Sequence, residues 1–400
     1  MAGRRRVRGS HVVALCLLLV ALVGCGGRPA TDTARADVQR LLDRRAAALL
    51  AHDATAYAGT GAAEGYARVR AVPLEDFSYR VRAVHGDGAA RTADVRLSYR
   101  VRGYDRAPVT AGRTVRLARG ADGGWAVTAE APAPGAGAQL WDQGTVDVVR
   151  GERSLVMGVG QSGERLHTFA DLADRAVPAV SAAWGTGWAL HVVVLVPPSL
   201  DGMAALLGSP ASSYRGIAAV TTGETGGPPR APADRIVVNP DAYGMLGAAG
   251  RQVVLTHETT HVATRAHTNA ATPLWLSEGY ADYVGYRDTG RTPAEVAPEL
   301  VGAVAGGNAP AALPTDADFG FSGDAVRLAE AYEGGWLACR MIAGRWGEER
   351  LDAFYRAVGA HGKRAGAVEG ALRDVLGTSL VDFTADWRQY VRDQLAAPAG

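Results

Sequence analysis

Cysteine is scarce in this chain of 400 residues, which contains three. Cys16 and Cys25 lie in or just after an apolar N-terminal stretch, so Cys339 has no obvious disulfide partner. Cys339 belongs to the apolar run from Gly335 to Ile342, which is typical of a buried, inert thiol rather than a nucleophile or a metal ligand. The sequence therefore excludes a disulfide framework as the source of stability.

The chain also lacks an excess of charge of either sign. Its 42 basic residues are balanced by 41 acidic ones, and Lys363 is the single lysine. Proteins that bind nucleic acid or anionic membranes through a basic patch concentrate Lys and Arg on one surface. We therefore expect no nucleic-acid partner and no polybasic membrane contact.

The apolar stretch Val12–Val23 is too short to cross a bilayer as a helix. It follows a basic stretch that contains four arginines, a pattern typical of a signal peptide. Leu22-Val23-Gly24-Cys25 resembles the lipobox of bacterial lipoproteins. The resemblance implies that residues 1–25 are a signal peptide with lipidation at Cys25, and that the mature protein is extracytoplasmic and lipid-anchored to the bacterial cell membrane. An ordinary secretory signal with an incidental cysteine is the open alternative.

Residues 31–130 have the pattern of an α+β domain. Apolar residues at helical spacing predict a helix over 31–52, and from Phe77 to Glu130 the apolar period changes to two, with glycine-rich turns between the segments. A helix followed by a curved antiparallel meander resembles the cone-shaped fold of the nuclear transport factor 2-like superfamily. The domain has no cluster of acids, histidines or nucleophiles, so we expect a spacer or partner-binding role.

A segment rich in Ala, Pro and Gly at 131–139 predicts a linker, and a second domain is expected over 140–400. Strands are predicted at Thr145–Val149, Ser154–Gly158 and His191–Val196, and a helix lies between the second and third of them. Two further strands are expected at 217–221 and 235–239. Helical patterns then continue to the C-terminus, after a loop at 302–321.

The strongest functional pattern is His257-Glu258-Thr259-Thr260-His261. Apolar spacing without proline from Gly250 to Ala266 predicts a helix through it. Side chains four residues apart lie on one helix face, so both imidazoles can reach one metal ion. Glu258 lies beside that face, where a carboxylate can take a proton from a metal-activated water. The pattern predicts a Zn²⁺ site.

A carboxylate for a third ligand position follows 17 residues after His261. Glu278 lies in Trp275-Leu276-Ser277-Glu278-Gly279-Tyr280-Ala281-Asp282-Tyr283, and Pro273 just before this run predicts a helix start. Glu278 and the two histidines together make a complete set of three protein ligands.

His-Glu-x-x-His followed by a Trp-Leu-x-Glu-Gly-x-Ala-x-Tyr helix resembles the gluzincin metallopeptidases, the group that includes thermolysin and aminopeptidase N. The resemblance spans residues 185–395 through short motifs. It implies that His257, His261 and Glu278 bind zinc and that Glu258 is the general base and acid. It also implies that Asp282 holds the first zinc histidine by its other ring nitrogen. A solvated helix residue is the alternative for Asp282.

Two further features bear on this resemblance. Tyr332 lies in a Tyr-x-x-Gly context 54 residues past Glu278, which resembles the tyrosine that stabilises the oxyanion in aminopeptidase N-like enzymes. A packed helix tyrosine is the alternative. No Gly-x-Met-Glu-Asn run precedes the metal helix, so exopeptidase activity is not implied. Residues 216–221 are the expected edge strand that would pair with an extended substrate.

These patterns predict an α+β protein: an N-terminal helix with a curved, cone-like antiparallel sheet, then a mixed α/β zincin-like domain with a helical C-terminal part. The predicted function is zinc-dependent hydrolysis of a peptide or protein substrate by a lipid-anchored metallopeptidase. The open alternative is a catalytically inactive zinc-containing lipoprotein whose N-terminal domain captures a partner or ligand. The sequence does not predict substrate sequence, endo- or exo-cleavage, or oligomeric state.

Overall fold

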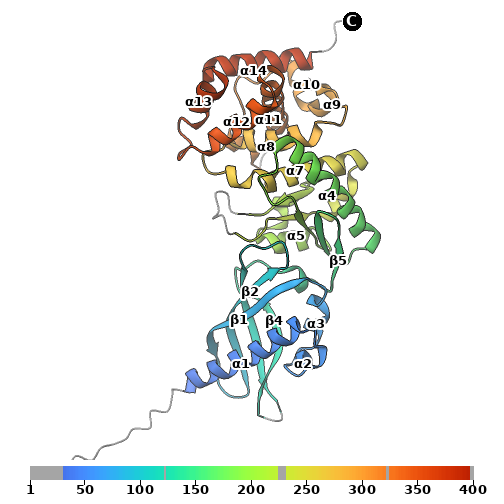
Figure 1. Cartoon of the computed structure of the whole chain (residues 1–400), viewed down its shortest axis with the longest axis vertical. Coiled ribbons are helices and arrows are strands. Elements are labelled where there is room, and N and C mark those ends of the chain that lie inside the picture. Colours follow the sequence, from blue (N-terminus) through green and yellow to red (C-terminus); the bar gives the residue numbers. More distant parts are fainter. Residues whose placement is uncertain (1–29, 121–122, 224–230, 321–323, 397–400) are drawn as a thin grey trace, which may run out of the picture.

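The protein is elongated, with its elements stacked in sequence order along the long axis (Figure 1). This computed structural model describes residues 30–120, 123–223, 231–320 and 324–396. The expected signal peptide and Cys25 lie outside these ranges, so lipidation stays a prediction. Within the same ranges, no helix is both long and apolar enough to cross a membrane.

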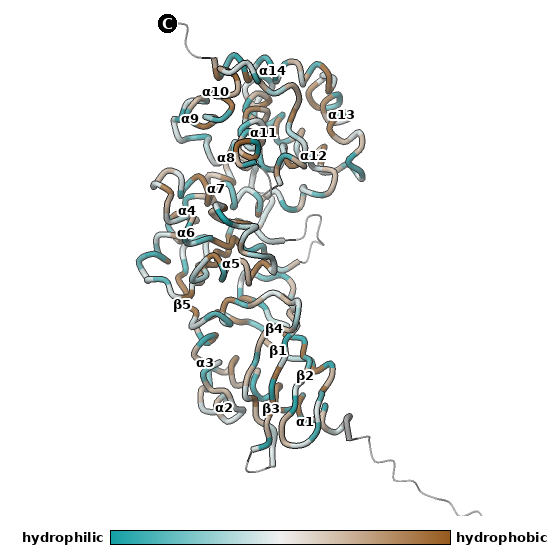
Figure 2. Tube along the Cα trace, turned by 180° about the vertical axis from the view of Figure 1, so that it is seen from behind, coloured by the Kyte–Doolittle hydropathy of each residue, from teal (hydrophilic) through white to brown (hydrophobic). Residues whose placement is uncertain are grey.

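The N-terminal part is one helix packed on a four-stranded antiparallel sheet of order β1-β2-β3-β4. Hydrophilic and hydrophobic residues alternate along these strands (Figure 2), so one sheet face is buried against α1. Interruptions of the strand register at three points bend the sheet. The elements are α1 (Ala30–Leu50), α2 (Ala54–Ala58), α3 (Glu64–Val69), β1 (Leu74–His85), β2 (Ala90–Val101), β3 (Val109–Arg119) and β4 (Trp125–Pro132).

The segment 131–139 is more ordered at its ends than a linker composition suggests. Strand β4 runs to Pro132, which pairs with Arg113, because the partner strand β3 is long enough to continue the ladder. Ala133 then donates its N–H to the Gly112 carbonyl, and Ala138 donates to Ala205. The sheet therefore extends two residues into the expected linker.

A second, mixed sheet of order β5-β6-β7-β9-β8 forms the middle of the molecule. Side chains of β7 alternate between its faces: Val192, Val194 and Val196 pack under helices, whereas Val193 and Leu195 face the N-terminal sheet. The three-residue strand β8 lies at the edge, within the segment expected there. The elements are β5 (Val146–Arg150), β6 (Ser154–Val159), α4 (Gly163–Trp184), β7 (Val192–Val196), α5 (Leu200–Leu207), β8 (Ala219–Thr221), β9 (Arg235–Val238), α6 (Pro240–Met245) and α7 (Ala248–Thr264).

The two sheets share one hydrophobic core. Leu97 and Val115 of the first sheet belong to the same buried cluster as Leu155, Met157 and Val193 of the second. Two buried ion pairs cross the same boundary. The Arg113 guanidinium donates to both Asp142 oxygens at 2.8 and 2.6 Å, and Arg235 donates to both Asp105 oxygens at 2.8 Å.

The C-terminal part is helical, as the sequence indicates, and it lies beyond α4 and α7 along the long axis (Figure 1). The expected loop at 302–321 is shorter than predicted, because α10 continues to Ala305 and a short turn of helix forms at Asp316–Phe319. The fold thus confirms the α+β class, the antiparallel and mixed sheets and the helical end. The helices are α8 (Leu274–Tyr286), α9 (Pro293–Val296), α10 (Pro298–Ala305), α11 (Ala325–Trp346), α12 (Glu348–Gly359), α13 (Ala367–Ala371) and α14 (Leu380–Leu395).

Helices α8 and α11 cross at a contact between backbones. A Cβ atom at Gly279 of α8 would overlap the Gly335 carbonyl of α11, and one at Gly335 would lie 2.6 Å from the Trp275 oxygen. Only glycine permits this separation, because neither backbone can give way as a flexible side chain can. The crossing therefore sets where every side chain of α8 lies relative to α11.

We expect Gly335→Ala to lower the free energy of unfolding by about 1–3 kcal/mol, the usual cost of inserting a methyl group into a packed core. The matched control is Gly344→Ala in the same helix, where a Cβ meets nothing within 4 Å. The control should be neutral or slightly stabilising, since alanine favours helix over glycine by about 0.5–1 kcal/mol. Chemical denaturation measures both. Equal stability of the two variants would contradict the close crossing.

Candidate metal centre

Helix α7 carries the first two candidate ligands on one face. His257 and His261 are four residues apart, their ring centroids lie 4.7 Å apart, and their Nε2 atoms are 3.0 Å from each other. Both Nε2 atoms therefore point at one spot. Both imidazoles thus lie on one face of α7, as the spacing of four residues predicts.

Helix α8 brings the third candidate ligand to the same spot. Glu278 Oε2 lies 3.2 Å from His257 Nε2 and 3.4 Å from His261 Nε2. Ligands about 2.0–2.1 Å from a tetrahedral zinc ion are separated from one another by about 3.3 Å. The three donor atoms already have the spacing of a tetrahedral zinc site with its fourth position open, so the residues fit the metal.

Asp282, one turn after Glu278, contacts the ring nitrogen of His257 that is not directed at the other two donors. Its Oδ1 lies 2.7 Å from His257 Nδ1. When the Nδ1–H donates to this carboxylate, the Nε2 lone pair is left facing the other two donors. The structure thus puts Asp282 against the first histidine, and its partly buried side chain is not a solvated helix residue.

The charges of the centre are strongly coupled. Burial lowers the pKa of His257, but the Asp282 and Glu278 carboxylates outweigh burial and raise it well above its usual value. Burial likewise raises the pKa of Glu278, but the charge of His261 and hydrogen bonds from both histidines hold it well below its usual value. Glu278 is therefore ionised, as a metal ligand must be.

Glu258 is buried beside the ligands and is held by the edge strand. Thr221, the last residue of β8, donates its hydroxyl to Glu258 Oε2 at 2.6 Å and lies 3.1 Å from the Glu258 carbonyl oxygen. Thr221 is not among the site residues that the sequence motifs predict. Its position at the end of the expected edge strand is the one signal that could have found it.

Tyr332 extends from α11 toward the same acids. Burial, then the charges of Glu278, Asp282 and Glu258, raise the pKa of Tyr332 well above its usual value, so the phenol keeps its proton. Its ring packs edge-on against Phe319 with the centroids 5.1 Å apart. The phenol is thus a hydrogen-bond donor in the neighbourhood of the centre.

Other polar side chains near the motif helices have partners of their own. Tyr280 donates to Asp352 at 2.6 Å and Tyr283 donates to Glu348 at 2.8 Å, both on α12. His267 packs on Trp184 and lies 3.2 Å from an Arg356 nitrogen. Burial raises the pKa of the Cys339 thiol well above its usual value, which agrees with an inert cysteine.

Among solved structures, the chain is similar to an M1 zinc metallopeptidase from Deinococcus radiodurans, with 12% sequence identity and a TM-score of 0.35 over 78% of this chain and 92% of that one. For a mutant of an M1 zinc metallopeptidase from the same organism, bound to a Tyr-Ser-Ala substrate, the identity is 11% and the TM-score 0.33 over 78% and 91% of the two chains. No protein-family model and no curated protein matches the chain. Identity and TM-scores this low do not assign the chain to a family.

Proposed function

We propose that this chain is a zinc-dependent peptidase. The observation that carries the proposal is the set of three donor atoms from His257, His261 and Glu278, separated by 3.0–3.4 Å. These distances match tetrahedral zinc, and the buried carboxylate of Glu258 lies beside them. A purely structural zinc site needs four protein ligands and no base.

Zn²⁺ bound at these residues supplies Lewis-acid activation of water and of a scissile carbonyl. Glu258 takes the proton of the attacking water and gives it to the departing amine. Thr221 fixes the Glu258 carboxylate by hydrogen bonding to one of its oxygens, which leaves the other free for the proton. Asp282 holds His257 in the tautomer that ligation requires.

Two further elements serve the substrate. Tyr332 donates a hydrogen bond to the oxygen on which negative charge develops. Strand β8 is the last strand of the sheet within the described ranges, and its outer edge offers backbone groups to an extended peptide, an arrangement that recognises main chain rather than sequence. A protein or peptide is therefore the substrate class.

We also propose that the enzyme is extracytoplasmic. Lipidation at Cys25 anchors it to the bacterial cell membrane, since acyl chains contribute about 0.8 kcal/mol per buried CH₂. The support for this is the sequence alone: a basic stretch, a short apolar run and the Leu-Val-Gly-Cys ending.

Glu258→Gln should leave zinc bound and lower kcat by about 10²–10⁴, because the amide cannot accept the proton. The exposed Glu349→Gln is the matched control and should leave kcat unchanged. Metal analysis and a peptide-library cleavage screen measure both, and a chelator should abolish the wild-type rate until zinc is restored. A zinc-containing wild type that cleaves no peptide would favour the inactive, binding lipoprotein instead.

Asp282→Asn should weaken zinc binding about 10–100-fold, the usual effect of removing the partner of a ligating histidine. Asp288→Asn, an exposed substitution just past α8, is the control. Competition with a zinc-binding dye measures the affinities. Unchanged affinity in Asp282→Asn would show that the contact with His257 does not support ligation.

Tyr332→Phe should lower kcat about 10²–10³-fold with zinc content unchanged, because one oxyanion donor is lost. Tyr283→Phe removes a phenol that bonds to Glu348 and should have little effect. Steady-state kinetics on a cleaved peptide separates the two. A wild-type kcat in Tyr332→Phe would make Tyr332 a packing residue only.

A further inference from the structure

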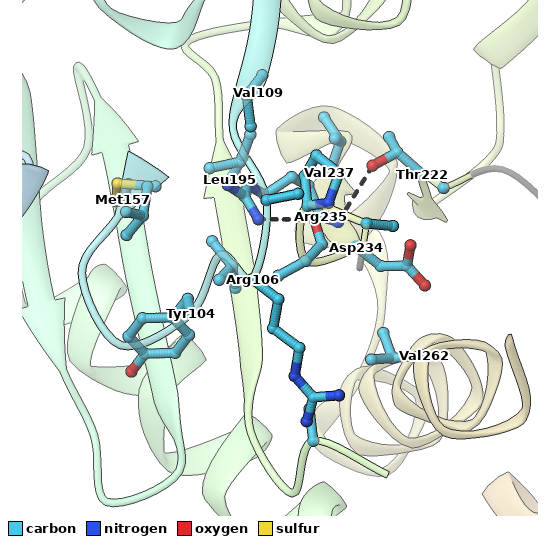
Figure 3. Close-up of a pocket in the computed structure, with 18 of the residues that line it drawn as sticks. Tyr104, Arg106, Val109, Met157, Leu195, Thr222, Asp234, Arg235, Val237 and Val262 are labelled. Carbon is cyan, nitrogen blue, oxygen red and sulfur yellow. Dashed lines mark hydrogen bonds between the residues drawn. The ribbon is translucent and has the colours of Figure 1, made fainter. Parts of the chain in front are cut away.

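A cavity of about 810 Å³ lies between the N-terminal sheet and the mixed sheet. Its walls come from the segment between β2 and β3, from the inner face of the mixed sheet and from the C-terminal half of α7 (Figure 3). Pockets that bind small molecules have volumes of about 300–1,000 Å³. The cavity is therefore large enough for a whole ligand.

The floor of the cavity is apolar. Met157, Leu195 and Val237 are partners in register across β6, β7 and β9, so they form one row on the sheet face that looks away from α4. Val101 and Val109 face this row from the N-terminal domain. Met157, Val237 and Val101 are almost fully buried, so a hydrocarbon body placed here would exchange water for apolar contacts at the half-buried Leu195 and Val109.

Three arginines line the cavity, and two of them are paired with carboxylates. Arg235 is paired with Asp105, and the Arg265 side chain donates to Asp234 at 2.8 Å. Arg106 also lines the cavity, is exposed, and has no carboxylate partner within the described part of the chain. Figure 3 shows its extended side chain among the lining residues. The cavity thus has an apolar floor and one uncompensated positive charge.

The walls are fixed in place before any ligand arrives. Asp105, which is buried in the N-terminal domain, accepts hydrogen bonds from Val101, from the Ala233 N–H at 3.0 Å and from Arg235. The bonds from Ala233 and Arg235 join the two walls across more than a hundred residues of sequence. A site that is already formed saves the ordering cost of binding.

We propose that this interdomain cavity binds an amphipathic molecule that consists of an apolar body and one carboxylate. The body lies against Leu195 and Val109, above the buried Met157 and Val237, and the carboxylate bonds to the Arg106 guanidinium. Two sources have this chemistry: a free acyl carboxylate and the carboxyl end of an apolar peptide. The site is separate from the proposed zinc ligands, and it stands even if the peptidase proposal fails.

The cavity also reaches α7, the helix that carries two of the candidate metal ligands. Val262 and Arg265 line it, and they lie within one helix turn of His261. A ligand there would contact the helix that carries both histidines. Binding can nevertheless be measured without any hydrolysis.

The test is calorimetric titration of the zinc-loaded full chain, free of detergent, with octanoate, decanoate and dodecanoate. Each added methylene should tighten binding about fourfold while the cavity still has room. Decanol, which lacks the charge, should bind about tenfold more weakly than decanoate. An apolar hexapeptide with a free carboxyl end, tested against its amidated form, distinguishes the second source.

Two variants locate the binding. Arg106→Gln should weaken decanoate about tenfold and leave decanol unchanged, whereas the exposed Arg96→Gln in β2 should change neither. Leu195→Trp should fill the floor of the cavity and remove binding of both, with thermal unfolding as the check on folding. No binding of any carboxylate at millimolar concentration would overturn the proposal. So would an Arg106→Gln effect no larger than that of Arg96→Gln.

Discussion

The backbone contact between Gly279 of α8 and Gly335 of α11 is the constraint on which the candidate centre depends. Helix α8 carries Glu278 and Asp282, and both must meet His257 of α7 to within a few tenths of an ångström. Helix α11 packs against α8 at this crossing, and it also carries Tyr332 toward the candidate centre. A larger residue at the crossing would move two acids and a phenol together. The two glycines therefore help to set the positions of Glu278, Asp282 and Tyr332.

The electrostatics of the centre follow from this packing. Glu258, Glu278 and Asp282 are all largely buried around the two histidines. Buried charge without compensation costs several kcal/mol per ion, so three carboxylates in one place require positive charge. Protonated His257 supplies part of it, which is why its pKa is raised despite burial. A divalent cation would supply more and would displace that proton. The gathering of three largely buried carboxylates around two histidines is thus a reason to expect a cation here that does not depend on any likeness to known enzymes.

The sequence predicts features that depend on local periodicity better than those that depend on distant contacts. The ligand spacing on α7, the helix that carries Glu278 and the strand pattern of both sheets are periodic, and each is found where expected. The contact of Asp282 with His257 is implied by the resemblance to the gluzincins, because Asp282 occupies the matching position in the motif that contains Glu278. The contact of Thr221 with Glu258 could not be predicted, since it depends on which strand lies at the sheet edge. The short helices α5 and α6 have too few residues for a periodic signal. The cavity could not be predicted either, because its walls come from segments that lie far apart in the sequence.

The shared core changes how the N-terminal domain must be regarded. A spacer joined by a flexible linker could be removed without harm, and composition alone suggests such a spacer. Instead, Leu155, Met157 and Val193 of the mixed sheet are buried against it, and Asp105 neutralises Arg235 across the boundary. Deleting the domain would expose an apolar sheet face and leave a guanidinium of β9 without its partner, and removing one member of a buried pair costs about 3–5 kcal/mol. A truncated chain that lost activity would therefore reveal instability of the mixed sheet, not a role in catalysis. Only substitutions that keep the interface intact can distinguish the functional roles of the two domains.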